Sequence, residues 1–361
     1  MSVKVAFVGI VGVPANYGGF ETLVEQLLTS WERDDDFNAQ LTVFCEKTSS
    51  YKIGTYKGAI IEYSPFKANG WQSILHDVYC AFRAAVKGHT HIVMLGVSGA
   101  IIIPFIRMFF RSTVITNCDG IEWKRAKWNI YTKILLYVLE YIAVRCSHIT
   151  IADNICIEEY LRKKYDKKNV SVIEYGGNQA DDVVPETNNE LEHLKNYALA
   201  LCRIEPENNV EMILKAFTNS GKNLVFVGNW SNSTYGVSLY EKFGVFPNIT
   251  LLNPIYSPQY LKYVRKNAVV YVHGHSAGGT NPALVEMMCL GVPVFAYGCD
   301  YNRATTENQA FYFNDEVALA NMIGATASRD LEENGNLMKG IGTRRYSWNV
   351  IARKYKELII D

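Results

Sequence analysis

Short apolar runs alternate with helix-like segments along most of the chain, and this alternation restricts the fold more than any other feature. A continuous apolar run such as Val3–Val8 is typical of a central strand in a parallel sheet, because both faces of that strand are buried. The first series of predicted strands comprises Val3–Val8, Leu41–Cys45, Ala59–Tyr63, His91–Leu95, Thr113–Asn117, Ser147–Ala152 and Val170–Glu174. Helix-like segments separate these strands, so the order favours a doubly wound parallel sheet.

The same alternation restarts after a polar run that extends from Tyr175 to Asn196, which we interpret as a linker. The second series of strands comprises Tyr197–Leu201, Leu224–Val227, Ile249–Leu252, Val269–Val272 and Pro293–Ala296. A chain of 361 residues is too long for one ordinary core and fits two domains of about 150–200 residues each. We therefore predict an α/β protein with two doubly wound domains, residues 1–178 and 179–345, followed by an amphipathic helix.

Composition narrows the class of protein. Lys plus Arg (36) equals Asp plus Glu (36), so no bulk nucleic-acid binding is expected. The eight cysteines are scattered without a C-x-x-C pair, which is typical of a reducing cytoplasm. The N-terminus lacks the layout of a signal peptide. The longest apolar run, from Ile92 to Phe110, is interrupted by Pro104 and Arg107 and reads as strand, turn and helix.

A glycine turn follows the predicted strand Val269–Val272. Asn281 is a candidate helix N-cap, and Pro282 suits the first helical position, where its missing N–H costs nothing. Gly278 and Gly279 let the backbone approach a ligand closely, while the helix N-terminus favours an anion such as phosphate. The same residues also fit an ordinary strand-to-helix turn with Glu286 facing solvent, and the pattern leaves both interpretations open.

Charged residues also stand at two predicted strand ends, where active groups of such sheets gather. Arg203 follows a strand beside Pro206 and could reach the cleft lined by the glycine turn, or it could pair with Glu205 or Glu207 at the surface. Asp119 follows another strand beside a glycine, where an aspartate can be catalytic or can simply stabilise a turn.

Two other sites are considered and rejected. The loop Gly9–Gly19 follows the first strand, but it lacks the G-x-G-x-x-G spacing, and Pro14 stands where the helix should have begun. A dinucleotide site is therefore excluded, and a flexible loop lining a cleft is expected instead. His273 and His275 share one strand face and could meet at a metal ion. Because no Cys or carboxylate is spaced to complete the ligand set, we predict no metal site.

Basic and aromatic residues are crowded in the segments Phe105–Arg111 and Lys124–Cys146. The second segment is predicted as one long amphipathic helix. It could be a core helix with a solvated end, or it could lie at a membrane interface in contact with anionic lipid.

Several of these motifs together resemble a known family. They are Pro14–Glu21, Asp119–Arg125, Arg203–Asn209, Gly278–Pro282 and Glu286–Val294. Over essentially the whole chain the sequence resembles the retaining GT-B glycosyltransferases of family four, and the first four motifs are similar to the bacterial polysaccharide rhamnosyltransferase subgroup. The resemblance implies two Rossmann-like domains facing across a cleft. It also implies that a terminal helix, within residues 346–361, crosses back and completes the first domain.

The resemblance also implies roles for individual residues. Glu286 would bind the nucleotide ribose, and Asp119 would lie near the reacting sugar. Arg203 would hold the donor diphosphate. The further binding residues implied are Gly278, Gly279, Thr280 and Asn281 at the diphosphate, and Gly18 and Gly19 at the acceptor side of the phosphate pocket.

This sequence departs from the family pattern at two places. The family commonly has a Lys shortly after the Arg, where this chain has Asn208 and Asn209, so Lys124 or Arg125 would have to supply that charge. The family also commonly has a second Glu, which contacts the sugar, eight positions before the ribose-binding one. That position is Gly278 here, so sugar recognition must differ, and a deoxy-sugar donor is one explanation.

The resemblance implies a retaining, metal-independent transferase that needs no cofactor. Its donor would be dTDP-rhamnose, and it would move L-rhamnose onto a lipid-diphosphate-linked saccharide during capsular, O-antigen or cell-wall polysaccharide synthesis. We expect a cytoplasmic protein in peripheral contact with the inner face of the membrane. Two alternatives remain: a GT-B sugar-nucleotide epimerase, which needs no acceptor, and a scaffold that binds a nucleotide-sugar without turning it over.

Overall fold

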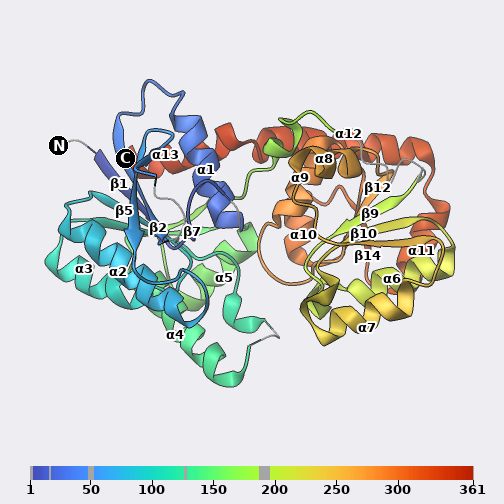
Figure 1. Cartoon of the computed structure of the whole chain (residues 1–361), viewed down its shortest axis with the longest axis horizontal. Coiled ribbons are helices and arrows are strands. Elements are labelled where there is room, and N and C mark those ends of the chain that lie inside the picture. The colour runs from blue at the N-terminus through green and yellow to red at the C-terminus, as the bar shows by residue number, and fades with distance from the viewer. Residues whose placement is uncertain (1–2, 16–17, 48–52, 126–127, 187–195, 361) are drawn as a thin grey trace. The chain divides into compact units, whose positions relative to one another are not determined.

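The computed structural model describes residues 3–15, 18–47, 53–125, 128–186 and 196–360, which fall into two compact units (Figure 1). Unit 1 comprises Met1–Glu174 and Trp348–Asp361, and unit 2 comprises Tyr175–Ser347. The segment that begins at Tyr175 therefore belongs to unit 2. Gly177 packs so closely on a helix of that unit that a Cβ atom at this position would lie 2.6 Å from the carbonyl carbon of Val285. Part of the predicted linker, residues 187–195, lies outside the described residues.

The described residues of unit 1 form an eight-stranded sheet in the order β3-β4-β2-β1-β5-β6-β7-β8. Its strands are β1 (Val3–Val8), β2 (Ala39–Glu46), β3 (Thr55–Tyr56), β4 (Ala59–Ser64), β5 (His91–Leu95), β6 (Thr113–Asn117), β7 (Ile149–Ala152) and β8 (Val170–Val172). Every pair is parallel except β3 with β4. The predicted central position of β1 is confirmed, since it pairs with strands on both sides and its second half is fully buried.

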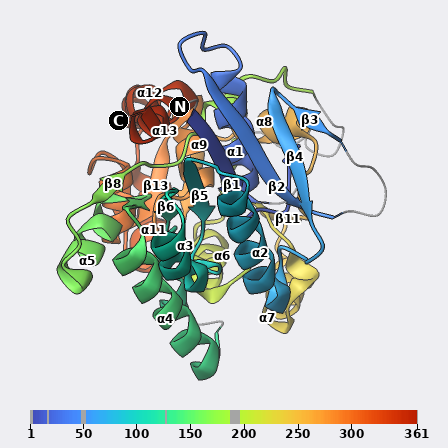
Figure 2. The same ribbon diagram turned by 90° about the vertical axis from the view of Figure 1, so that its left-hand side faces the viewer.

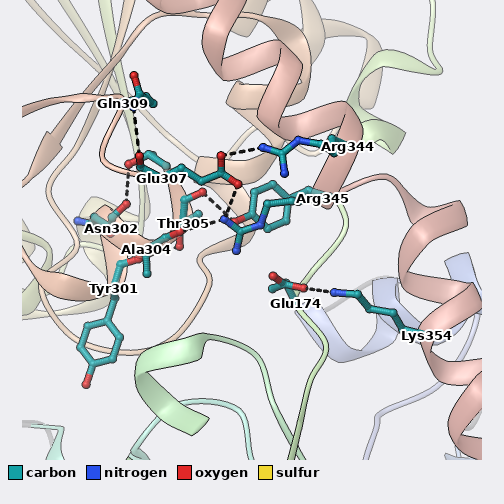
Figure 3. Close-up of polar contacts among 12 residues, drawn as sticks. Glu174, Tyr301, Asn302, Ala304, Thr305, Glu307, Gln309, Arg344, Arg345 and Lys354 are labelled. Atoms are coloured by element: carbon teal, nitrogen blue, oxygen red, sulfur yellow. Dashed lines mark hydrogen bonds and ion pairs between the residues drawn. The ribbon is translucent and has the colours of Figure 1, made fainter. Parts of the chain in front are cut away.

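Helices cover both faces of this sheet. They are α1 (Gly19–Trp31), α2 (Ser73–Val86), α3 (Ile103–Phe109), α4 (Ile130–Cys146), α5 (Ile155–Tyr165) and α13 (Trp348–Ile360). In Figure 2, α2, α3 and α4 lie on one side of the sheet. The terminal helix α13 returns to unit 1, as expected: Trp31 Nε1 donates to the carbonyl of Ala352 (3.2 Å), and Lys354 pairs with Glu174 (2.6 Å, Figure 3).

Helix α4 begins later than predicted. The sequence suggested a start at Lys124, but Glu122–Lys124 forms only a 3₁₀ turn, and the helix starts at Ile130. Asn129 sets this start, because its side chain accepts a hydrogen bond from the backbone N–H of Thr132 (2.9 Å). None of the described helices is both long and apolar enough to cross a bilayer.

The described residues of unit 2 form a six-stranded parallel sheet in the order β11-β10-β9-β12-β13-β14. Its strands are β9 (Ala198–Leu201), β10 (Leu224–Val227), β11 (Ile249–Leu252), β12 (Val270–His273), β13 (Val294–Tyr297) and β14 (Phe311–Phe313). Its helices are α6 (Val210–Ser220), α7 (Thr234–Phe243), α8 (Pro258–Lys266), α9 (Pro282–Leu290), α10 (Asp300–Thr305), α11 (Glu316–Ala325) and α12 (Ser328–Arg345).

The helices of unit 2 also form two layers. In Figure 1, α6, α7 and α11 lie on one side of the sheet, and α8, α9 and α12 lie on the other. Unit 2 has one hydrophobic core on each face of its sheet, and alternate residues of β9 point into the two cores. Leu199 packs in the core that contains residues of α9, and Ala200 packs in the core that contains residues of α6. The end of α12 is fixed by Glu307, which accepts hydrogen bonds from Arg344 (2.7 Å) and Arg345 (3.0 Å, Figure 3).

The strand order of the second sheet reverses at one point. In unit 2 the chain runs outward from β9 through β10 to β11, and then from β12 through β13 to β14 in the opposite direction. The loops after β9 and β12 therefore leave the carboxyl edge of the sheet side by side. Ligands of doubly wound sheets bind in the crevice at such a reversal.

Candidate functional site

Two loops of unit 2 are joined at this reversal point: residues 202–209 after β9 and residues 274–281 after β12. Asn209 Nδ2 donates to the carbonyl of Gly274 (2.8 Å), and the backbone N–H of Ser276 donates to the carbonyl of Glu207 (3.0 Å). The contact requires a glycine at position 274, because a Cβ atom there would lie 2.2 Å from the carbonyl oxygen of Asn208. The two loops therefore form one packed unit.

His275 connects the loops after β9 and β12 with helix α10. Its Nδ1 lies 2.6 Å from Oδ1 of Asn208, whose Nδ2 donates to the carbonyl of Arg203 (2.7 Å). Its own carbonyl accepts a hydrogen bond from Nδ2 of Asn302 in α10 (2.8 Å). His275, Asn208 and Asn302 are all buried. The loops after β9 and β12 and the helix α10, which follows β13, are thus held together by buried hydrogen bonds.

Arg203 extends from this network toward solvent. Its side chain is 56% exposed, and its Nε lies 3.9 Å from Oε2 of Glu205. The surface ion pair between Arg203 and Glu205, one of the two alternatives considered from the sequence, is therefore present, but the distance between its charged atoms is long. Exposed ion pairs of this kind contribute only about 0–1 kcal/mol. The exposed guanidinium of Arg203 is therefore accessible to an anion near the joined loops.

The turn into α9 has the predicted capping. The side chain of Asn281 accepts a hydrogen bond from the N–H of Ala283 (3.0 Å), Pro282 occupies the first turn, and Gly291 ends the helix with φ 75°. Gly278 has φ 121°, a left-handed conformation that only glycine adopts without strain. The turn and the helix N-terminus, whose partial positive charge suits an anion, thus lie in the same loop as His275.

Glu286, on the second turn of α9, is largely buried in unit 2, with 15% of its side chain exposed. It forms an ion pair with Arg265 of α8, and its Oε1 accepts a hydrogen bond from Nε2 of Gln179 (2.7 Å). Burial raises the pKa of Glu286, and the charge of Arg265 and the bond from Gln179 oppose that rise. Sequence reasoning missed both partners, because they lie 21 and 107 positions away and no motif marks them.

The remaining candidates, Gly18, Gly19 and Asp119, belong to unit 1. Gly18 and Gly19 lie at the start of α1, and a Cβ atom at position 18 would come within 2.9 Å of Oε2 of Glu21. Asp119 follows β6 in a left-handed conformation (φ 55°) and is half-buried. Arg203, the glycine turn and Glu286 therefore lie in unit 2, while Gly18, Gly19 and Asp119 lie in unit 1.

The loop after β1 is more firmly attached than the predicted flexible wall. Oε1 of Glu21 accepts a hydrogen bond from the N–H of Val11 (2.8 Å), and Oε2 of Glu25 accepts one from the N–H of Ala15 (3.0 Å). These two backbone amides are therefore already bonded within the protein. Residues 16–17 of the motif lie outside the described residues.

His273 and His275 lie near each other, with ring centroids 6.0 Å apart. Nδ1 of His273 lies 3.2 Å from the hydroxyl of Tyr271, so this ring, like that of His275, has a partner within the protein. Within the ranges that the structure describes, no group of three or more His, Cys, Asp or Glu side chains is arranged to hold a metal ion.

Two known protein families match parts of this chain. Residues 2–178 match a domain of unknown function (DUF1972), and residues 186–319 match the family described as glycosyl transferases group 1. A search of curated protein sequences found no match.

Solved structures share the whole architecture at low sequence identity. A sucrose-phosphate synthase of Thermosynechococcus elongatus is 16% identical over 99% of this chain and 98% of its own, with a TM-score of 0.81. HepE of Anabaena in complex with UDP-glucose is 14% identical over 99% of both chains, with a TM-score of 0.72. Trehalose-6-phosphate synthase OtsA is 10% identical over 99% of both chains, with a TM-score of 0.73. The fold is that of the GT-B glycosyltransferases, with two Rossmann-like domains built on parallel sheets.

Proposed function

We propose that this chain, whose second unit carries the match to glycosyl transferases group 1, is a glycosyltransferase that takes its sugar from a nucleotide diphosphate donor. The observation that carries the proposal is the joining of the loops after β9 and β12 at the reversal of the second sheet. Arg203 and the glycine turn before α9 are brought there by independent stretches of sequence. HepE, which has the same fold, binds UDP-glucose.

The donor is held by residues of unit 2. Arg203 provides a guanidinium that matches two phosphate oxygens, and the amides of Gly278, Gly279, Thr280 and Asn281 add the partial charge of the α9 N-terminus. Glu286 accepts hydrogen bonds from the ribose. A carboxylate has about four acceptor positions, so ribose hydroxyls can bind while Gln179 and Arg265 remain in place.

Transfer proceeds with retention. The acceptor hydroxyl approaches on the face from which the diphosphate leaves, and the leaving phosphate oxygen takes its proton. The protein then needs no strong base and contributes positioning and charge stabilisation. Asp119 lies near the reacting sugar, and Gly18 and Gly19 shape the acceptor side. Positive charge from Arg203 and the helix N-terminus serves in place of a metal ion.

The donor is dTDP-rhamnose. Support comes from the four motifs similar to rhamnosyltransferases and from Gly278, which offers no carboxylate to the sugar hydroxyls. Rhamnose has no hydroxyl at carbon 6, so it needs fewer polar partners than glucose does.

The acceptor is a lipid-diphosphate-linked saccharide at the membrane surface. Helices α3 and α4 of unit 1 contact each other and expose apolar side chains, among them Met108 (75% exposed) and Tyr131 (81% exposed). Arg107 and Lys133 lie on the same helices, and Glu140, the one acidic residue in their sequences, is buried. An apolar surface on two helices whose exposed charged side chains are cations suits an anionic bilayer.

A ligand panel with product analysis tests the proposal. A ligand that binds only the native state stabilises it by RT ln(1 + [L]/Kd), so thermal shifts report donor preference. We expect dTDP and dTDP-rhamnose to raise the Tm more than UDP, GDP and their sugars do. Turnover with a lipid-diphosphate saccharide should be insensitive to EDTA. Sugar release or epimerised donor without an acceptor would contradict the proposal, and so would nucleotide binding without any product.

A further inference from the structure

Asp119 follows a strand end whose peptide groups are fixed by both neighbouring strands. The carbonyl of Asn117, the last residue of β6, accepts a hydrogen bond from the N–H of Gly96 (2.9 Å), and the N–H of Cys118 donates to the carbonyl of Ile151 (3.0 Å). Asp119 itself has φ 55°, a left-handed conformation that costs free energy in a residue with a side chain. Such a conformation persists only where the surrounding structure holds it.

The side chain of Asn117 holds this conformation. The N–H of Asp119 donates to Oδ1 of Asn117 (3.0 Å), and Nδ2 of Asn117 lies 2.9 Å from the hydroxyl oxygen of Tyr355 in α13. A backbone N–H can only donate, so the amide oxygen of Asn117 must face Asp119 and its NH₂ group must face Tyr355. The hydroxyl oxygen of Tyr355 is therefore an acceptor that fixes the orientation of the amide. Tyr355 and Asn117 are both buried, so losing one partner leaves the other unsatisfied.

Helix α13 is itself fixed to unit 1 next to this contact. Trp31 Nε1 of α1 donates to the carbonyl of Ala352, about one turn before Tyr355 (3.2 Å). Lys354, the residue before Tyr355, pairs with Glu174 (2.6 Å, Figure 3). The hydroxyl of Tyr355 is thus held in place by contacts that do not involve the loop after β6.

We infer that Tyr355 is a positioning residue of the transfer reaction, which acts through Asn117 to hold the backbone of Asp119 in its left-handed conformation. The inference rests on the proposed function, in which Asp119 lies near the reacting sugar. That proposal assigns the donor to residues of unit 2, whereas Tyr355, Asn117 and Asp119 all belong to unit 1. Loss of the Tyr355 hydroxyl should therefore lower the rate of transfer and leave donor binding unchanged.

Tyr355→Phe removes the acceptor, and a matched control removes a similar hydrogen bond elsewhere. Burial raises the pKa of the Tyr355 hydroxyl, so the substitution removes a hydrogen-bonding oxygen and no charge. Tyr197→Phe in unit 2 is the control, because Tyr197 is also 1% exposed and its hydroxyl donates to the carbonyl of Val264 (2.7 Å). The Tm of each variant reports its folding. Calorimetry with dTDP-L-rhamnose, and in parallel with UDP-glucose, measures donor affinity.

Kinetics with a synthetic lipid-diphosphate-linked saccharide as acceptor measure the effect on transfer. We expect Tyr355→Phe to lower kcat about tenfold, while donor affinity changes less than about twofold. Tyr197→Phe should lower the Tm to a similar extent and leave kcat within about twofold of the wild type. An unchanged kcat in Tyr355→Phe, an equal loss of kcat in Tyr197→Phe, or a matching loss of donor affinity in Tyr355→Phe overturns the inference.

A double-mutant cycle shows whether Tyr355 acts through Asp119. Asp119→Gly removes the side chain but leaves a residue that adopts the left-handed conformation without strain, and it should lower kcat by itself. In that background Tyr355→Phe should lower kcat no further, because the residue it positions is gone. A further loss of about tenfold would show that Tyr355 acts by another route and would also overturn the inference.

Failure of the proposed function gives a different result. A wild type without transfer would contradict the proposed function itself. Normal kcat in Asp119→Gly would contradict the role proposed for Asp119 and take the inference with it. Low kcat in Asp119→Gly together with normal kcat in Tyr355→Phe would overturn the inference alone.

Discussion

Arg265 and Glu286 form an ion pair inside unit 2, where 9% and 15% of their side chains are exposed. The pair links α8 to the helix that carries the glycine turn. Burial raises the pKa of Glu286 even with Arg265 beside it, and the charge of Arg265 opposes that rise. The ion pair therefore favours the charged carboxylate, the form that is proposed to accept hydrogen bonds from the ribose.

Removing Arg265 should strongly destabilise unit 2. In Arg265→Met the carboxylate of Glu286 remains buried without its cation, which typically costs about 3–5 kcal/mol. The double variant Arg265→Met/Glu286→Gln should recover most of that loss, because no uncompensated charge remains. Urea denaturation at neutral pH measures both. A single variant within about 1 kcal/mol of the wild type would show that the pair contributes little.

Asn209 should matter both for its backbone conformation and for its side chain. It has φ 51°, and its Nδ2 donates to the carbonyl of Gly274 (2.8 Å). Asn209→Ala loses the hydrogen bond and strains the backbone, so a loss of about 2 kcal/mol is expected. Asn209→Gly loses only the hydrogen bond and should cost about 1 kcal/mol. Equal losses in the two variants, measured by denaturation, would rule out the strain component.

Binding to anionic vesicles should depend on the exposed apolar surface of α3 and α4. Replacing Phe109 and Ile134 by Ser removes two exposed apolar side chains and should reduce co-sedimentation with anionic vesicles severalfold. Val245→Ser is a matched control, because Val245 is also exposed but belongs to unit 2. Binding that is unchanged in the double variant, or is lost equally in the control, would place the membrane contact elsewhere.

His273 should make the protein less stable in acid. Burial, with a smaller effect from His275, lowers the pKa of His273 well below its ordinary value of 6.5. The unfolded chain therefore binds a proton that the folded protein excludes. This contribution to stability is complete above pH 6.5 and is lost as the pH falls toward the lowered pKa.

In His273→Gln this proton uptake is absent. The free energy of unfolding should therefore depend less steeply on pH between about pH 5 and 6.5 than it does in the wild type. Some slope should remain, because the pKa values of His76 and His89 are also lowered by burial. A slope equal to that of the wild type would mean that His273 does not titrate on unfolding.

Much of the fold could be predicted because most of its strands are short apolar runs that are largely buried. The bounds of His91–Leu95, Thr113–Asn117 and Leu224–Val227 agree with the structure residue for residue. The long helix was wrong at its start, because the basic residues from Lys124 onward were read as its first turn. The capping signal at Asn129 was the better guide.

The candidate site was predictable only where local chemistry marks it. Asn281 and Pro282 indicate the start of α9 from the sequence alone. The structure confirms Asn281 as the N-cap and Pro282 as a residue of the first turn. The partners of Glu286 and His275 come from distant segments and are chosen by tertiary packing. Local spacing carries no information about Arg265 or Asn208, so these contacts became visible only in the folded chain.

The most direct test of the proposed donor site is the effect of Arg203→Ala on kcat/KM with the preferred nucleotide-sugar. Loss of one charged contact to the departing diphosphate typically costs about 3 kcal/mol, roughly a hundredfold in rate. Arg329, an exposed arginine on α12 of the same unit, provides the control. We expect a loss of about a hundredfold in Arg203→Ala and none in Arg329→Ala. Near-normal turnover in Arg203→Ala would remove that guanidinium from the site and contradict the central claim.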